Sequence, residues 1–68
     1  MTIRLNGEER RLDDAATVQT ALDLLDVTPD SRGVAVAVDR EVVPRARWHE
    51  TPLHDGAQVE VVMAIQGG

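Results

Sequence analysis

The absence of cysteine from a chain of only 68 residues is the feature that most limits what it can fold into. A domain of this size buries only about 60% of its unfolded-chain surface, so without disulfides or thiolate-bound metals its hydrophobic core must supply the stability. Phe and Tyr are absent as well, and Trp48 is the only aromatic residue. We therefore expect one domain spanning residues 1–68, with an aliphatic core and with Trp48 filling the space beneath a loop.

The charge of the chain limits its partners. Twelve acidic residues oppose seven basic ones, all of them arginine, and the formal net charge is −5. A nucleic-acid-binding surface is normally basic and offers aromatic residues for stacking, so we expect no nucleic-acid partner. The N-terminal segment lacks a long apolar run, so we expect no membrane partner, no signal peptide and a cytoplasmic location.

The first twelve residues have the pattern of a β-hairpin. Ile3 and Leu5 alternate with polar residues, as in a half-buried strand. Asn6-Gly7 then favours a two-residue turn, because both residues accept a positive φ. A returning strand is expected over residues 8–12.

One amphipathic helix is predicted to follow the hairpin. Its apolar residues, spaced at i, i+3, i+4 and i+7, are Val18, Ala21, Leu22 and Leu25. Thr17 is the expected N-cap, with its hydroxyl accepting a hydrogen bond from the first turn. Residues 27–33 contain proline and glycine and are expected to end the helix and form a loop.

The second half of the chain contains short apolar runs bounded by turn residues. Residues 34–38 alternate valine with alanine and predict a third strand, which Asp39-Arg40 turns into a short strand over 41–43. Pro44 ends that strand, because it cannot donate to a β-ladder. Residues 58–65 are the last strand, and their valines and few charges suit a central position.

This order of elements predicts an α+β domain with one mixed sheet of four to five strands and one main helix packed across one face. The first and last strands are expected side by side in the middle. Alternation directs one set of side chains toward the helix: Val34, Val36, Val38, Val59, Val61 and Met63.

The opposite sheet face is a candidate docking surface. It is expected to hold Ala35, Ala37, Val62 and Ala64, with Arg4 nearby on the first strand. Exposed contiguous apolar area often marks a binding site, which predicts that a partner docks here. The alternative is that these are the stray alanines that sheet faces often carry.

The chain ends in Gly67-Gly68, directly after the last strand. Glycine packs nothing and loses the most backbone freedom on ordering, so a diglycine anchors a terminus poorly. Without Cβ atoms, these residues can thread a narrow slot in another protein and present the terminal carboxylate for reaction. A frayed tail without function is the alternative.

The remaining polar clusters match no catalytic or metal-binding pattern. The chain has no GxSxG, P-loop or dinucleotide fingerprint, so we expect no enzymatic activity of its own. His49, Glu50, His54 and Asp55 lack the spacing of a zinc site, so no metal site is expected. The charged side chains expected to be solvated are Asp13, Asp14, Asp23, Asp26, Arg45 and Arg47.

Several segments together carry a family resemblance. They are Asn6-Gly7-Glu8, Ala16-Thr17-Val18, residues 34–38, residues 42–48, residues 55–60 and Ile65-Gln66-Gly67-Gly68. The most specific are Val43-Pro44-Arg45, with Trp48 three positions later, and the terminal diglycine. The order and length of the elements resemble the β-grasp, or ubiquitin-like, fold. Within it, the whole chain closely resembles the thiazole-biosynthesis sulfur carrier proteins.

The resemblance implies a carrier that partner enzymes act on. An adenylating, E1-like enzyme would activate the Gly68 carboxylate with ATP, and a sulfur-transfer protein or other sulfur donor would convert it to a thiocarboxylate. The carrier would then give its sulfur to a thiazole synthase of the thiamine pathway. Residues 66–68 would be a flexible tail, with Gln66, Gly67 and Gly68 threading the partner's site. The carrier itself would bind no cofactor.

The chain departs from the family pattern at two positions. Asp39-Arg40 replaces the usual Asn-Gly of the second hairpin, and Arg resists a positive φ. Gln66 stands where a small residue is common, which bears on the fit to the activating enzyme.

The alternative functions are another β-grasp sulfur carrier, such as the small subunit of molybdopterin synthase or a carrier for cysteine synthesis, and a ubiquitin-like tag or interaction module. The short length and the Pro44-Arg45 segment with Trp48 favour the thiazole branch.

Overall fold

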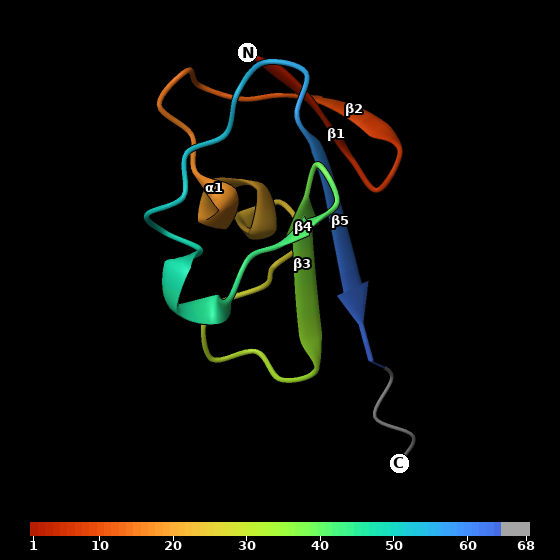
Figure 1. Ribbon diagram of the computed structural model, residues 1–68, viewed down its shortest axis with the longest axis vertical. Helices are drawn as coiled ribbons and strands as arrows, with labels where there is room; N and C mark the ends of the chain where they lie inside the picture. Colours follow the sequence, from red (N-terminus) through yellow and green to blue (C-terminus); the bar gives the residue numbers. More distant parts are fainter. Residues whose placement is uncertain (65–68) are drawn as a thin grey trace.

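The elements follow the predicted order (Figure 1). The computed structural model describes residues 1–64, so Ile65, Gln66, Gly67 and Gly68 lie outside the described residues. The elements are β1 (Thr2–Leu5), β2 (Glu8–Arg11), α1 (Val18–Asp23), β3 (Val34–Val38), β4 (Glu41–Val42), a 3-10 helix (Arg45–Arg47) and β5 (Gln58–Met63).

The strands form one mixed sheet in the order β2-β1-β5-β3-β4. β1 and β5 run parallel, and the other neighbouring pairs are antiparallel. In Figure 1, α1 lies to one side of β3 and β5, and the chain between the 3-10 helix and β5 runs along the side of α1 that faces away from the sheet. The predicted α+β architecture, with the first and last strands adjacent, is confirmed.

The helix begins where the sequence predicts and ends early. Thr17 is the N-cap and forms a capping box with Thr20, whose hydroxyl accepts the Thr17 N–H at 3.0 Å. The helix ends at Asp23, although the apolar spacing extends to Leu25. Asp26 has a φ of 58°, a left-handed conformation that helices cannot continue through.

The core contains the predicted sheet and helix residues around Trp48, which is only 1% exposed. Its indole Nε1 donates a hydrogen bond to the Val43 carbonyl at 3.1 Å, so its polar atom is satisfied in the core. Four buried residues lie in connections between the predicted elements: Ala16, Val27, Leu53 and Ala57. A chain this short uses its connections to cover the core, because one six-residue helix cannot do so alone.

One predicted inward side chain is wrong. Met63 is 50% exposed. Its register partner is Val34, at the end of the β3–β5 ladder. α1 rises only about 9 Å along its axis, at 1.5 Å per residue, so it covers the middle of β5 but not its end.

Both two-residue turns adopt left-handed backbone conformations. Asn6 and Gly7 have φ values of 51° and 82°, as predicted. Asp39 and Arg40 have φ values of 51° and 71°, so the second hairpin keeps the same conformation without a glycine. The Asp39 N–H donates to the Gln58 carbonyl at 2.8 Å, which holds this turn against β5.

Candidate functional site

One face of the sheet carries no helix, and it includes the predicted docking residues. In the strand register, Arg4 lies beside Gln58, Ala37 beside Glu60, and Ala35 beside Val62. Val62 is 64% exposed. Arg4, Ala35 and Ala64 are also exposed, and Ala37 is half-buried. We call the surface formed by Arg4, Ala35, Ala37, Val42, Glu60, Val62 and Ala64 the open face.

Two residues of the open face are absent from the sequence-based prediction. Val42 lies beside Ala37 across the β3–β4 pair and is 75% exposed. Glu60 lies between Gln58 and Val62 on the same face of β5 and places a carboxylate among small side chains. The register of the second hairpin would have revealed Val42, and strict alternation along β5 would have revealed Glu60.

The open face is hollowed by two shallow depressions. The larger, of about 380 Å³, is lined mainly by Arg4, Asn6, Gly7, Gln58, Glu60 and Val62. The smaller, of about 280 Å³, is lined by Asp39, Arg40, Gln58 and Glu60. Gln58 and Glu60 border both depressions. Mixed polar and apolar lining of this kind suits contact with protein side chains.

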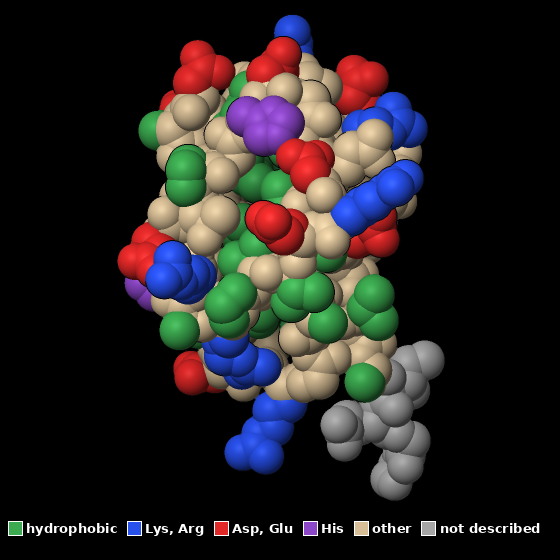
Figure 2. All heavy atoms as spheres, in the orientation of Figure 1, with side chains coloured by type: hydrophobic (Ala, Val, Ile, Leu, Met, Phe, Trp, Pro, Cys, Tyr) green, Lys and Arg blue, Asp and Glu red, His purple; other side chains and the backbone are tan. Residues whose placement is uncertain are grey.

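Side-chain types are unevenly distributed over the molecule. In the view of Figure 2, hydrophobic side chains gather in the lower half, acidic side chains and a histidine occupy much of the upper half, and basic side chains lie in both halves. The lower half is the end toward which β5 runs in Figure 1. The surface near the end of β5 is therefore less acidic in this view than the net charge of the chain suggests.

The strand that leads to the tail is held by an asparagine side chain. Asn6 Oδ1 accepts the Val61 N–H at 2.8 Å, and Asn6 Nδ2 donates to the Val61 carbonyl at 3.3 Å. The amide thus continues the β1–β5 ladder beyond the end of β1. Nothing in the sequence besides the turn signal pointed to this second role of Asn6.

His54 and Asp39 join the second hairpin to the loop before β5. His54 Nε2 lies 2.6 Å from Asp39 Oδ2, and His54 Nδ1 lies 2.8 Å from the Asp55 carbonyl oxygen. Both partners accept hydrogen bonds, so the two contacts favour the doubly protonated, charged imidazole. The bond to Asp39, and then the bond to the Asp55 carbonyl, raise the pKa of His54.

Asp39 is held as a carboxylate from two sides. The Gln58 N–H, which donates to its Oδ1 at 3.0 Å, lowers its pKa most, and His54 lowers it further. His54 is thus used in a structural pair. Within residues 1–64, no group of three or more His, Asp or Glu residues is close enough to hold a metal ion.

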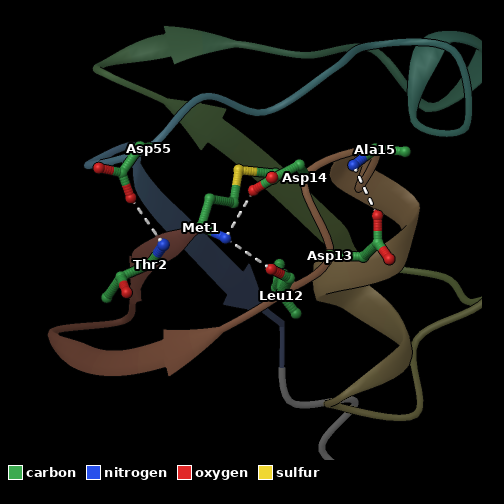
Figure 3. Close-up of polar contacts among 7 residues, drawn as sticks. All are labelled: Met1, Thr2, Leu12, Asp13, Asp14, Ala15 and Asp55. Atoms are coloured by element: carbon green, nitrogen blue, oxygen red, sulfur yellow. Dashed lines mark hydrogen bonds and ion pairs between the residues drawn. The ribbon is translucent and has the colours of Figure 1, made fainter.

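A second polar cluster surrounds the N-terminus (Figure 3). The Met1 ammonium donates to the Leu12 carbonyl at 2.8 Å and to Asp14 Oδ1 at 2.9 Å, and it lowers the pKa of Asp14. The Thr2 N–H donates to Asp55 Oδ1 at 2.7 Å. Because β1 and β5 are parallel, this cluster lies at the end of the sheet opposite the tail, and its contacts are structural.

Arg45 is exposed, as predicted, and it also makes two contacts that the sequence did not indicate. Its guanidinium donates to the Pro29 carbonyl at 2.6 Å and lies 5.3 Å from the centre of the Trp48 ring. Arg47 is exposed, as predicted, with its Nε 3.9 Å from Glu50 Oε1.

Among the helices of the described part, none has the length and hydropathy needed to cross a membrane.

The comparison with known proteins covers nearly the whole chain. The ThiS family model matches residues 3–68. The sulfur carrier proteins ThiS of Escherichia coli and Thermus thermophilus are 31% identical over 68 residues and 39% identical over 64 residues, and the matches span 100% and 95% of those proteins. A thiazole synthase from Paramagnetospirillum magneticum is 40% identical over 68 residues, but the chain spans only 20% of that protein.

A solved structure has the same arrangement of elements. The crystal structure of the thiamine biosynthesis protein (ThiS) from Geobacter metallireducens superposes with a TM-score of 0.76 at 28% identity, over all of both chains. Since sequence and structure agree along essentially its full length, the chain belongs to the ThiS family of thiamine-pathway sulfur carriers and has their β-grasp fold.

Proposed function

We propose that this protein carries sulfur as a thiocarboxylate on Gly68. An adenylating, E1-like partner binds ATP, and the Gly68 carboxylate attacks its α-phosphorus, releasing pyrophosphate. A sulfur nucleophile, supplied by a sulfur-transfer protein or another donor, then attacks the carbonyl carbon and displaces AMP. The family match that runs through to the last residue carries this proposal.

The chemistry of the two steps determines what the partner enzyme supplies and what the carrier supplies. A carboxylate is a poor acyl donor, and adenylation gives it a good leaving group. Developing negative charge in both steps has to be stabilised by preorganised donors, which the partner's active site supplies. The carrier contributes an arm without side chains at Gly67 and Gly68 and holds no cofactor of its own. The use of ATP fits a cytoplasmic reaction.

The open face is the proposed docking surface for the adenylating enzyme. Its small apolar residues allow close approach of a partner backbone, while Arg4 and Glu60 offer one charge of each sign to orient it. Gln66 would follow the diglycine into the partner's slot. Thiazole synthase is the proposed sulfur acceptor, and the similarity of this chain to one fifth of a protein of that name supports the pairing.

Mass spectrometry of the intact protein tests the proposal. After incubation with the adenylating enzyme, ATP and a sulfide source, we expect one oxygen at the terminus to be exchanged for sulfur. Deletion of Gly68 or the substitution Gly67→Ala should abolish the exchange, because the carboxylate is displaced or a Cβ blocks the slot. Gln66→Ala is the matched control and should be converted, since small residues are common at that position of the family.

The same experiment distinguishes the other candidate functions. An isopeptide adduct on a partner protein would indicate a ubiquitin-like tag, and an unmodified terminus would indicate an interaction module. Normal conversion of the Gly67→Ala protein would contradict the role given to the diglycine. Recovery of a large molybdopterin synthase subunit in place of a thiazole synthase in a pull-down would assign the carrier to another pathway.

A further inference from the structure

Toward its C-terminal end, β5 is hydrogen-bonded to fewer neighbouring segments. At Gln58, β5 pairs with β1, and at Val59 it pairs with both β1 and β3. At Val61, the contact on the β1 side is the Asn6 side chain. Beyond it, the described hydrogen bonds of the chain lie only on the β3 side, and the last of them runs from the Ala64 N–H to the Gly33 carbonyl at 2.7 Å.

Gly33 is at this contact for two separate reasons. Its φ of +68° is a left-handed conformation that side chains resist. In addition, a Cβ on Gly33 would lie 3.2 Å from the Ala64 Cβ, which is tighter than an ordinary van der Waals contact, and 3.6 Å from the Ala64 carbonyl oxygen, which is an ordinary contact distance. Gly56 also has a positive φ, of +85°, but a Cβ there would meet nothing within 4 Å.

We propose that Gly33 is a positioning residue for sulfur loading, because its contact with Ala64 fixes the position of the residue that precedes the tail. This inference rests on the proposed function above. Gly68 lies four positions after Ala64, and a fully extended chain of that length spans no more than about 14 Å. A shift of Ala64 would therefore move the start of this segment relative to the docked open face.

The expected consequence is kinetic. The 3.2 Å contact requires Ala64 to shift by a few tenths of an ångström. Since a misplacement of about 1 Å at a reacting group can cost on the order of a hundredfold in rate, a shift of this size should cost several-fold. Gly33 contacts Ala64, which belongs to the open face, so a side chain at Gly33 should lower kcat for adenylation more than it raises KM for the carrier.

The test compares two glycines that both have a positive φ. Gly33→Ala and Gly56→Ala should both lower the melting temperature, because each places a side chain on a left-handed backbone. Pyrophosphate release by the adenylating enzyme is then measured at varied carrier concentration. We expect kcat to fall several-fold for Gly33→Ala only. Ala64 is part of the open face, so Ala64→Gly alone is measured as the reference for the double variant. Relative to that reference, adding Gly33→Ala should not lower kcat further, because the contact between the two Cβ atoms is absent although the strain at residue 33 remains.

A second pair of variants covers the case in which Gly33→Ala does not fold. Asn tolerates a positive φ better than Ala but still carries a Cβ, so Gly33→Asn should fold and lose kcat, and Gly56→Asn should not lose it. Equal kcat values for the two Asn variants would overturn the inference and leave the proposed function intact, as would an equal loss in both Ala variants. Failure of the unsubstituted protein to be adenylated would overturn the proposed function and the inference together.

Discussion

At the scale of single residues, His54 shows how an exposed side chain can join distant segments. It is 64% exposed, yet it bridges Asp39, fifteen positions away, and the Asp55 carbonyl. Water screens such a pair, so its contribution to stability is modest, but the two acceptors favour the protonated imidazole. Folding raises the pKa of His54 and lowers that of Asp39.

The raised pKa predicts a loss of stability on the alkaline side. A histidine whose pKa rises on folding contributes its full stabilisation of the folded state below its unfolded pKa of about 6.5. This stabilisation is lost as the pH rises through the pKa of the folded state. The Asp39 contribution is present above an unfolded pKa of about 3.9 and is lost in acid, so the pair is most stabilising between these two values.

Thermal melting of His54→Gln measures this effect. As the pH is raised from about 5.5 to about 8.5, the melting temperature of the parent protein should fall more than that of the His54→Gln protein. His49 is the other histidine and is exposed, so His49→Gln is the matched control and should keep the parent's pH dependence. An identical pH profile for all three proteins would show that the His54–Asp39 bond does not contribute in solution.

At the scale of elements, the two hairpins reach one turn conformation with different residues. The β1–β2 turn has glycine in its second position, with a φ of 82°, whereas the β3–β4 turn has Arg40 there, with a φ of 71°. An L-residue with a side chain is disfavoured in this region by about 1–2 kcal/mol. The pairing of β3 with β5 therefore imposes a turn that Arg40 does not favour.

Arg40→Gly is accordingly expected to stabilise the protein. Relief of strain is partly offset by the greater freedom of glycine in the unfolded chain, so the free energy of unfolding should rise by about 0.5–1 kcal/mol. Denaturant unfolding measures it. The reverse change at the equivalent position, Gly7→Ala, should lower the stability by about 1 kcal/mol, because a Cβ there meets nothing within 4 Å and only the backbone is affected. A destabilised Arg40→Gly protein would contradict the argument.

At the scale of the whole molecule, one short helix leaves a two-layer domain with an uncovered sheet face. α1 and the loop around it bury the side chains on one side, and Val42 and Val62 remain exposed on the other. The open face adjoins the end of β5, where Ala64 contacts Gly33. Docking on this face would place the partner next to Ala64, which precedes the proposed reactive arm.

Val62→Asp tests whether this face binds the adenylating enzyme. Val62 is 64% exposed, so the substitution should change the free energy of unfolding by no more than about 0.5 kcal/mol. Burying an unpaired carboxylate at the interface should weaken binding by about tenfold or more, as measured by titration calorimetry. Leu24→Asp adds the same charge to an exposed apolar residue of the helical layer and should bind normally. Unchanged affinity for Val62→Asp would exclude this face as the docking surface.

Much of the fold was predictable because its signals are local. Asn6-Gly7 defines a turn by its own backbone preferences, and the alternation of valine with alanine over residues 34–38 assigns each side chain to a face. The predicted positions of Val62 and Ala35 on the open face are confirmed for the same reason. The role of the terminal diglycine, and docking on the open face, stay predictions.

The sequence by itself determined the order of the elements, the two faces of the sheet and the family, since periodicity, turn chemistry and motif spacing act between near neighbours. Only the tertiary structure decided that Met63 is exposed, that Val27 and Leu53 are buried, and that Asn6 pairs with Val61, 55 positions away. These outcomes depend on the length of α1 and on the register of β5 between β1 and β3. Both are settled by the packing of the whole chain and not by any short segment of it.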